Sequence, residues 1–432
     1  MSEARIVRPD RSQLRWDMID LESLVASDHR VRGVWAFVER LDLSSLYEKV
    51  RAREGEAGRP AADPRVLLAL WIYATVEGVG SARELERLVE RDVAYRWLAG
   101  GVPVNYHGLS DFRSVHGEAL DGLLTQSVTS LIAADLVRLD EIAVDGTKLR
   151  ASAGAKSFRT RKGLEQVKTA VAARLRALKQ ELASDGGAST RRRQGARERA
   201  ARDVAERAAR AQEAMERLEA EQEARRKTHP KDEAQKSERR VSLTDPQARV
   251  MRFADGARRA GYNAQIGACA KTGVIVSIAT TDRRNDLGLA EARVEDIARR
   301  YGQTPKRLLV DAGYKPDIAA LAAHPQGPVE VYAPLPQERP NVKPSTLYRR
   351  ARERLREPEC VRQWRERMQG EAGRLAAAAR MRIERVNAAC KNRGFGTIPV
   401  RGLAKAQAFA LLHALANNFM ASQRLLAPKA AA

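Results

Sequence analysis

The hydrophobic pattern of the chain changes at residue 141, and this change constrains the fold more than any other feature of the sequence. Up to about residue 130 the apolar residues recur at helical spacing. From residue 141 onward, short apolar runs of strand character alternate with helical stretches. Strands that alternate with helices predict an α/β sheet with functional groups at the strand ends. We therefore expect an all-helical N-terminal domain at residues 1–138 and an α/β domain at residues 139–427.

The N-terminal part contains recognisable helix boundaries. Residues 63–64, Asp followed by Pro, predict a helix start, because Pro is favoured at the first helical position. A second helix is predicted over residues 81–98, where Ser81 and Glu84 have the spacing of a capping box. A polar turn at residues 105–108 leads into another helix. This pattern fits a DNA-reading unit or an ordinary helical bundle, and the bundle is narrowly favoured.

Two apolar runs in the second part each end in an aspartate. The run at residues 142–144 is followed by Asp145, and the run at residues 308–310 is followed by Asp311. Both runs predict buried strands that carry the acid at their C-terminal end. The remaining elements predicted here are the two strands of a β-hairpin, a helix and one more strand, at residues 262–266, 274–278, 286–300 and 329–332.

Residues 155–240 interrupt the α/β pattern with a different one. Leucines and valines at three-four spacing predict two antiparallel helices on either side of a turn at residues 185–187. The outer faces are rich in Arg, including Arg191, Arg192 and Arg193. A solvated coiled-coil face and a clamp on DNA phosphates are both compatible with this pattern. A polar loop is expected at residues 227–240 and an extended connector at 334–344.

The charge balance favours a polyanionic partner. The 432 residues include 77 Lys and Arg against 55 Asp and Glu, a net charge of +22, and such an excess attracts nucleic acid through counterion release. An anionic membrane is the rival partner, but no apolar run is long enough to predict a membrane span. We therefore expect double-stranded DNA as partner and no membrane.

The N-terminal segment and the cysteines both indicate the cytoplasm. The first residues lack the apolar core of a signal peptide, which predicts a cytoplasmic, nucleoid-associated protein. Cys269, Cys360 and Cys390 lie far apart in the sequence and form no C-x-x-C motif, so we interpret them as reduced thiols. The six scattered histidines argue against a structural zinc site.

Residues 377–395 predict an amphipathic helix with a charged side. The apolar stripe expected to face the core is Leu375, Ala379, Ile383, Val386 and Cys390. Beside it, Arg380, Glu384 and Lys391 point within about 60° of one another. Gly394 is expected to end the helix in a left-handed conformation. By itself the charged side is compatible with a simple ion pair four residues apart.

The acids Asp145, Asp311 and Glu384 form the candidate catalytic set. Carboxylates that are brought together repel one another, so such clusters usually hold divalent cations, here Mg²⁺ or Mn²⁺. Two such ions can assist an in-line displacement at phosphorus, which suits so basic a chain. A single strand-end aspartate is weak support, because turns and helix caps also use Asp.

Glu371 competes with Glu384 for the third position. The two residues lie 13 apart, about 220° around a continuous helix, so they cannot share a face. Glu371 lies between two glycines, at 370 and 373, which predicts a helix start or loop rather than a rigid mount. Glu384 is therefore the expected metal ligand.

Several motifs in order resemble those of the DDE-type bacterial insertion-sequence transposases, in the broad IS-four-like group, over nearly the whole chain. The N-terminal part resembles that group at D-P-R-V-L-L-A-L-W-I-Y (63–73) and N-Y-H-G-L-S-D-F-R (105–113). The acid motifs are matched by I-A-V-D-G-T-K-L (142–149) and V-D-A-G-Y (310–314), and the hairpin motif by T-D-P-Q-A-R-V-M (244–251) and G-Y-N-A-Q (261–265). The third signature, Tyr-x2-Arg-x3-Glu-x6-Lys, is matched at Arg380, Glu384 and Lys391.

The resemblance implies an RNase H-like catalytic domain with a helical coiled-coil insertion, preceded by a helical DNA-binding domain. It implies a Mg²⁺-dependent transposase that binds terminal inverted repeats and performs DNA cleavage and strand transfer, as a homo-oligomer on DNA. Asp145, Asp311 and Glu384 would hold the metals, and Arg380, Lys391 and Arg393 would contact DNA.

One position departs from the signature. Ala377 stands where the family has tyrosine, so the role of that ring is not carried over. The alternatives left open are an RNase H-like nuclease or resolvase without strand transfer, and a DNA-binding derivative without catalysis.

Overall fold

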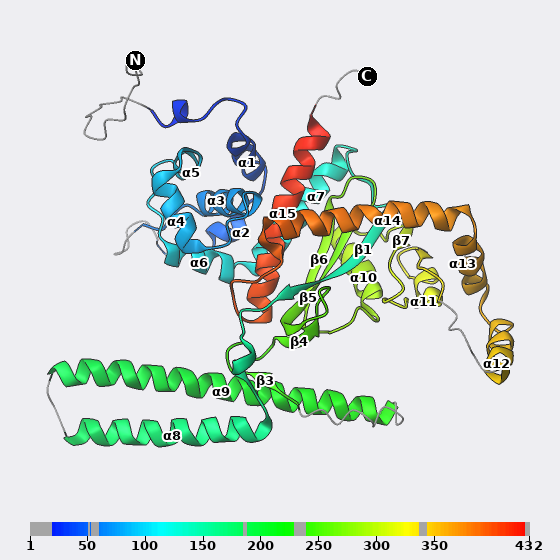
Figure 1. Cartoon of the computed structure of the whole chain (residues 1–432). Helices are drawn as coiled ribbons and strands as arrows, with labels where there is room; N and C mark the ends of the chain where they lie inside the picture. The colour runs from blue at the N-terminus through cyan, green and yellow to red at the C-terminus, as the bar shows by residue number, and fades with distance from the viewer. Residues whose placement is uncertain are drawn as a thin grey trace, which may run out of the picture.

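The structure is a computed structural model that describes residues 20–50, 52, 60–184, 188–228, 239–336 and 344–427. Helices fill the N-terminal region, a mixed sheet lies at the centre, and a long helical hairpin projects from it (Figure 1). A hydrophobic core runs from the N-terminal helices into the sheet, so the two regions pack directly on each other.

The N-terminal region is helical, as predicted. Its helices are α1 (Arg30–Glu39), α2 (Ser44–Tyr47), α3 (Pro64–Val76), α4 (Ala82–Arg91), α5 (Val93–Ala99), α6 (Tyr106–Val115) and α7 (Gly117–Ala133), after a 3-10 turn, η1 (Glu22–Leu24). Helix α3 is buried along nearly its whole length and forms the centre of this region. It begins as predicted, because the Asp63 side chain accepts a hydrogen bond from the Arg65 N–H.

The single helix expected over residues 81–98 is wrong. The Ser81 side chain caps α4 by accepting from the Glu84 N–H, as the capping-box spacing indicated. The chain then leaves helical geometry at Asp92, whose φ of -103° and ψ of 132° are extended. The Asp92 carboxylate accepts from the N–H groups of Ala94 and Tyr95 and so starts α5. Asp here acts as a cap for a new helix rather than as an interior residue.

The central sheet mixes parallel and antiparallel pairs, in the order β4-β5-β1-β7-β8, with β6 also paired to β5. The strands are β1 (Glu141–Arg150), β4 (Arg249–Arg252), β5 (Arg258–Cys269), β6 (Ile275–Thr281), β7 (Arg307–Leu309) and β8 (Glu330–Tyr332). The hairpin of β5 and β6 and the strand β8 confirm the sequence predictions. Strand β1 is antiparallel to β5 and parallel to β7.

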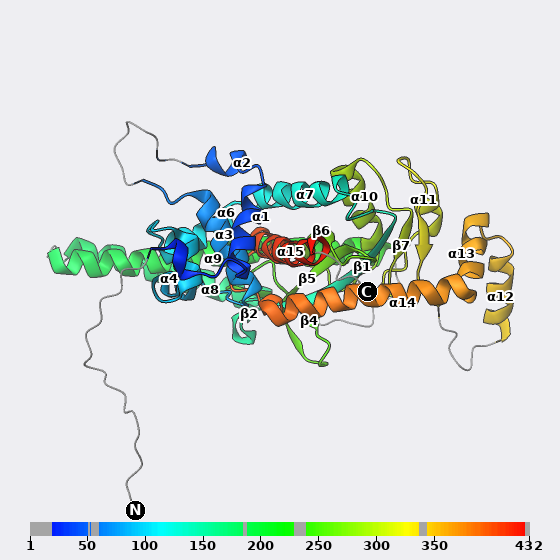
Figure 2. The same cartoon turned by 90° about the horizontal axis from the view of Figure 1, so that it is seen from above.

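Helices cover the sheet from several sides, as the view from above shows (Figure 2). Helices α10 (Leu289–Tyr301) and α14 (Glu371–Cys390) lie on opposite sides of it, and α15 (Leu403–Leu426) runs between the sheet and the N-terminal helices. The smaller helices α11 (Ile318–Ala322), α12 (Pro344–Arg354) and α13 (Glu359–Gln369) follow β7 and β8.

Side-chain amides of α15 cover the free edge of β6. The Asn418 side chain accepts from the Ile275 N–H at 2.8 Å and donates to the Ile275 carbonyl at 2.7 Å. Gln407 makes the same two kinds of bond, with the Thr280 N–H and the Ile278 carbonyl. These four bonds satisfy main-chain groups that an open edge would leave for another strand.

The inserted segment forms the predicted helical hairpin, of α8 (Arg161–Ser184) and α9 (Ala188–Thr228). The two helices lie side by side and extend away from the sheet (Figure 1). A short 3-10 turn, η2 (Ala155–Ser157), and the two-stranded pair β2 (Phe158–Arg159) and β3 (Val241–Ser242) connect the hairpin to the rest of the chain. A small separate core lies at this base, around Leu164 and Met215.

Parts of this segment lie outside the described residues, including the expected turn at 185–187, the side chains of Arg191 and Arg192, and most of the expected loop at 227–240 and connector at 334–344. Arg193 is described and is exposed. None of the described helices is long and apolar enough to cross a membrane.

The expected apolar stripe of α14 is partly wrong. Leu375 is 65% exposed, and Ala376 is buried instead. Ile383, Val386 and Cys390 are buried as predicted. The stripe is displaced because α14 begins at Glu371 and its first turns pack on α13, whereas its later turns pack on the sheet. The helix then ends in a π-type turn, η4 (Lys391–Phe395), in which Gly394 has the predicted positive φ of 90°.

Candidate active site

Asp145 lies in the middle of β1, not at the end of a strand as predicted. Strand β1 continues for five residues beyond Asp145, because the polar half of the strand pairs with β5 as far as Arg150. The sequence prediction stopped at the last apolar residue, although backbone pairing does not depend on side-chain polarity. Asp145 therefore has fixed backbone on both sides.

Asp311 lies next to Asp145. Strand β7 runs parallel to β1 with Leu309 beside Ala143, so two further residues bring Asp311 level with Asp145. The Asp311 Oδ1 accepts from the Gly313 N–H at 2.7 Å, which fixes the carboxylate just beyond the strand. Burial raises the pKa of Asp145 to about 6, and the nearby carboxylates of Asp311 and Asp286 add to this effect. Repulsion between neighbouring carboxylates is what the sequence predicted for this pair.

Helix α14 crosses over Asp145 and brings Asn387 to it. The Asn387 side chain donates to Asp145 Oδ2 at 2.6 Å, whereas its own Oδ1 is buried without a partner among the described residues. Glu384 lies one turn earlier on the same helix and forms an ion pair with Arg380 at 2.9 Å. The Glu384 side chain is 53% exposed. The helix thus places Glu384 one turn before Asn387, while its carboxylate is held by Arg380.

The basic residues of the predicted site lie along the same segment. Lys391 is exposed at the start of the turn η4, and Arg393 is half-buried two residues later. Ala377, at the position of the signature tyrosine, is exposed on α14. Glu371 is the first residue of α14, which confirms its interpretation as a helix start.

The oxygen atoms around Asp145 are of the kind that Mg²⁺ and Mn²⁺ bind. Asp145 and Asp311 supply neighbouring carboxylates, and the unpaired Oδ1 of Asn387 supplies a buried amide oxygen. Among the described residues, no three His, Cys, Asp or Glu side chains are gathered closely enough to hold a metal ion. Glu384 would have to exchange Arg380 for the aspartates to complete such a set.

Two family matches cover most of the chain. Residues 226–419 match the family described as Transposase DDE domain, and residues 19–115 match the Transposase domain (DUF772). The chain belongs to the insertion-sequence DDE transposases. No curated protein and no solved structure matches it significantly. The DDE match includes Asp311 and Glu384 and begins after Asp145, whose place in the site therefore rests on the pairing of β1 with β7.

The transposase carries a further acid at the site, Asp286, that sequence reasoning missed. It lies in the loop between β6 and α10 and packs against the face of β1 opposite to Asp145. Asp286 Oδ1 accepts from the side chains of Asn263 and Gln265, each at 2.7 Å, and faces the Lys148 ammonium at 3.5 Å.

Gly146 makes room for this cluster. A Cβ at position 146 would overlap both Asp286 Oδ1 and Gln265 Nε2, so a larger residue would displace the acid. Gln265 also accepts from the Tyr314 hydroxyl, which ties the Asp311 loop to β5. The available sequence signal was the alternation of Asn263 and Gln265, which puts two amides on one face of β5.

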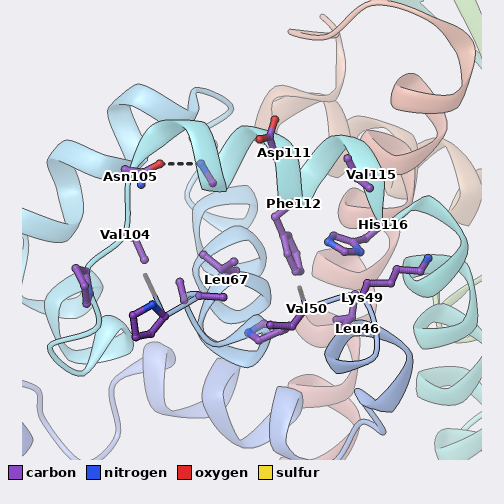
Figure 3. Close-up of a pocket in the computed structure, with 16 residues that line it drawn as sticks. Leu46, Lys49, Val50, Leu67, Val104, Asn105, Asp111, Phe112, Val115 and His116 are labelled. Atoms are coloured by element: carbon purple, nitrogen blue, oxygen red, sulfur yellow. Dashed lines mark hydrogen bonds between the residues drawn. The ribbon is translucent and has the colours of Figure 1, made fainter. Parts of the chain in front are cut away.

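A separate cavity of about 760 Å³ lies among the N-terminal helices of the transposase. Phe112 points into it from α6, and Leu46, Val50, Leu67 and Val115 also line it (Figure 3). The lining is mostly apolar, with Lys49, Asn105, Asp111 and His116 as its polar members (Figure 3), whereas DNA phosphates are bound mainly by cationic and polar groups. We therefore assign no DNA contact to this cavity.

Proposed function

We propose that this transposase binds the terminal inverted repeats of its insertion sequence, cleaves the DNA there, and joins the freed 3′-hydroxyl to target DNA. The observation that carries the proposal is the placement of Asp145 and Asp311 side by side under α14, with Glu384 one turn from the Asn387 that bonds Asp145. Three acids supplied by two neighbouring strands and a covering helix agree with the DDE family match.

In this proposal Asp145, Asp311 and Glu384 hold Mg²⁺ or Mn²⁺. Divalent ions bound there supply the activation of the attacking oxygen and the stabilisation of the leaving one. The chain's own residues position the reaction. Asn387 orients the Asp145 carboxylate, and Arg380, once it has released Glu384, is free to neutralise a phosphate.

The domain assignment completes the proposal. Residues 1–138 form the DNA-binding domain, and residues 139–427 form an RNase H-like catalytic domain that contains the hairpin insertion, coiled-coil in character, at 155–240. The strand–hairpin–helix–strand order supports this assignment. Lys391 and Arg393 contact DNA, and the protein acts as a homo-oligomer on DNA in the cytoplasm.

The test uses purified protein and a duplex that carries one end of the insertion sequence. Wild type should nick this duplex in Mg²⁺ and join the product to a second DNA, whereas Asp145→Asn and Asp311→Asn should bind the duplex and not cut it. Cleavage without joining would favour the nuclease alternative. Full cleavage by either variant would contradict the shared-metal assignment.

A further inference from the structure

A small cavity of about 210 Å³ lies between the N-terminal helices and the catalytic region. It is separate from the acids and is lined by α3, α6, the turn η4 and α15. The lining residues that matter here are Trp71, Gly80, Arg113, Arg393, Phe409 and His413. None of the described lining residues is acidic, although two of them are arginines.

Arg113 is a buried cation that forms no ion pair with an acid of the described residues. Its relative exposure is 5%, and burial lowers its pKa to about 10. The guanidinium lies over the Trp71 ring, 4.4 Å from the centroid, and donates to the Gly80 carbonyl at 2.6 Å. The Arg113 Nε is buried and has no partner among the described residues. The side chain is therefore held rigidly with a donor still unused.

Arg393 brings a second cation to the same cavity from the turn η4. Within the described part of the chain it forms no ion pair, and neither does Arg113. Arg113 and Arg393 line the same cavity as His413, and burial together with the charges of Arg393 and Arg113 lowers the pKa of His413 to about 3. His413 is 4% exposed and packs against Phe395 and Phe409, so it adds no charge.

The buried Arg113 guanidinium loses hydration and has no counter-ion among the described residues, and the second arginine of the cavity cannot supply one. An anion bound between the two arginines would be that counter-ion. Arginine presents a planar set of N–H donors that matches the oxygens of a phosphate group. A phosphate is thus the anion best suited to this pair in a protein that acts on DNA.

The cavity lies beside the far end of β1, because its lining residue Thr397 forms a bridge with Arg150. Residues 396–398 pair with Arg150 at the end of β1, five residues beyond Asp145. At the rise of an extended strand this separation is roughly 17 Å. A phosphate in the cavity would lie a few nucleotides from the phosphate that reacts near Asp145.

We propose that Arg113 and Arg393 form a binding site for one backbone phosphate of the DNA, at the junction of the N-terminal and catalytic regions. The proposal deepens the proposed function and rests on it, because it takes the substrate DNA as ligand. The site fixes the DNA between the two regions of the protein. It adds Arg113, the last residue of the 105–113 motif, for which the sequence predicted no DNA contact, to the contact expected of Arg393.

The main test combines protein variants with single changes in the DNA. Binding is measured in EDTA, without cleavage, between the full chain and a set of end-bearing duplexes that each carry one uncharged methylphosphonate. At one position of the duplex, or at two adjacent ones, the methylphosphonate should lower the affinity of wild type about tenfold. The affinity of Arg393→Gln should not change there, because this variant has already lost the contact with that phosphate. Arg393→Gln should also lower the slope of log affinity against log salt by about 0.9.

Arg424→Gln is the matched control, because it removes the same charge from an exposed position near the other end of α15. It should bind the whole set as wild type does. Arg113→Lys, checked for folding by thermal unfolding, should lose the same methylphosphonate dependence as Arg393→Gln. Equal position dependence in wild type and Arg393→Gln would overturn the proposal.

Free phosphate is distinguished from DNA by a separate measurement. Inorganic phosphate, compared with chloride at equal ionic strength, should raise the unfolding temperature of wild type and of Arg424→Gln, but not of Arg393→Gln. The opposite outcome is that phosphate raises the unfolding temperature in this way while wild type and Arg393→Gln show the same methylphosphonate dependence. That result would identify a free-phosphate site and overturn the DNA assignment. This test is independent of the test of catalysis. Asp145→Asn, measured in EDTA, should show the same methylphosphonate dependence of binding as wild type.

Discussion

Asp145 and Asp286 lie against opposite faces of strand β1, and the chain holds them in different ways. Asp286 faces an ammonium and accepts from two side-chain amides. Among the described residues, Asp145 accepts only from the Asn387 amide and the Gly146 N–H. Burial and two neighbouring acids raise its pKa, and the Arg380 charge offsets part of this rise. The comparison separates a carboxylate whose charge is compensated by the protein from one whose charge is left for a ligand.

The largest expected effect is the loss of cleavage in Asp145→Asn. The amide keeps the shape but loses the charge, so cleavage should fall at least about 1,000-fold, or roughly 4 kcal/mol of barrier. Metal-free Asp145→Asn should unfold at the same temperature as wild type or higher, because the variant removes a charge that the fold disfavours. Cleavage rates and thermal unfolding in EDTA measure the two effects. A large loss of stability would mean that Asp145 resembles Asp286 after all.

The choice of third acid gives the next prediction. Glu384→Gln should lose several orders of magnitude in cleavage, whereas Glu371→Gln, at the exposed start of α14, should be nearly silent. Single-turnover cleavage of an end-bearing duplex, with both variants shown to be folded, makes the measurement. The reverse result would move the metal site away from Asn387.

Asp286→Asn should mainly lower stability, whereas Asp145→Asn should mainly lower the rate of cleavage. Its Lys148 would lose the facing carboxylate, so we expect a loss of about 1–3 kcal/mol in the free energy of unfolding. Cleavage should fall only about tenfold, through a shift of β1. Denaturant unfolding measures the first effect. The control Asp255→Asn breaks an exposed pair with Arg259 and should leave the free energy of unfolding almost unchanged.

The smallest effect is expected for Arg380→Gln. Its pair with the half-exposed Glu384 should contribute less than about 1 kcal/mol to stability. The salt dependence of DNA binding should nevertheless decrease by about 0.9 in slope if Arg380 meets a phosphate. Arg362→Gln removes a comparable exposed pair, with Glu359 on α13, and should leave that slope unchanged. Equal slopes for both variants would limit Arg380 to its role beside Glu384.

Local signals were sufficient for much of the fold. The caps at Asp63 and Ser81, the hairpin of β5 and β6, and the left-handed Gly394 depend on neighbouring residues, which the sequence displays directly. Motif spacing predicted Asp145, Asp311 and Glu384 as the catalytic acids, and the pairing of β1 with β7 brings the two aspartates together.

The features that could not be predicted from the sequence depend on residues far away in the chain. The length of β1 depends on β5, more than a hundred residues later, and the exposure of Leu375 depends on where α13 packs. Asp286 lies in an unremarkable loop and becomes part of the site only through Gly146, Asn263 and Gln265. The break at Asp92 was missed for another reason, since both helices flanking it have good helical spacing.

The amides of α15 along β6 have a consequence for how the protein is made. Every strand of the sheet precedes α15 in the chain, so during synthesis β6 emerges with its outer main-chain groups unpaired until Gln407 and Asn418 arrive. The same helix packs on α3 and α7, so the packing of the N-terminal helices is also incomplete until α15 has been synthesised. A gene copy interrupted before residue 403 would therefore yield a chain in which the edge of β6 is unpaired. We expect such a chain to aggregate, and not to bind the ends of the element as an inactive competitor.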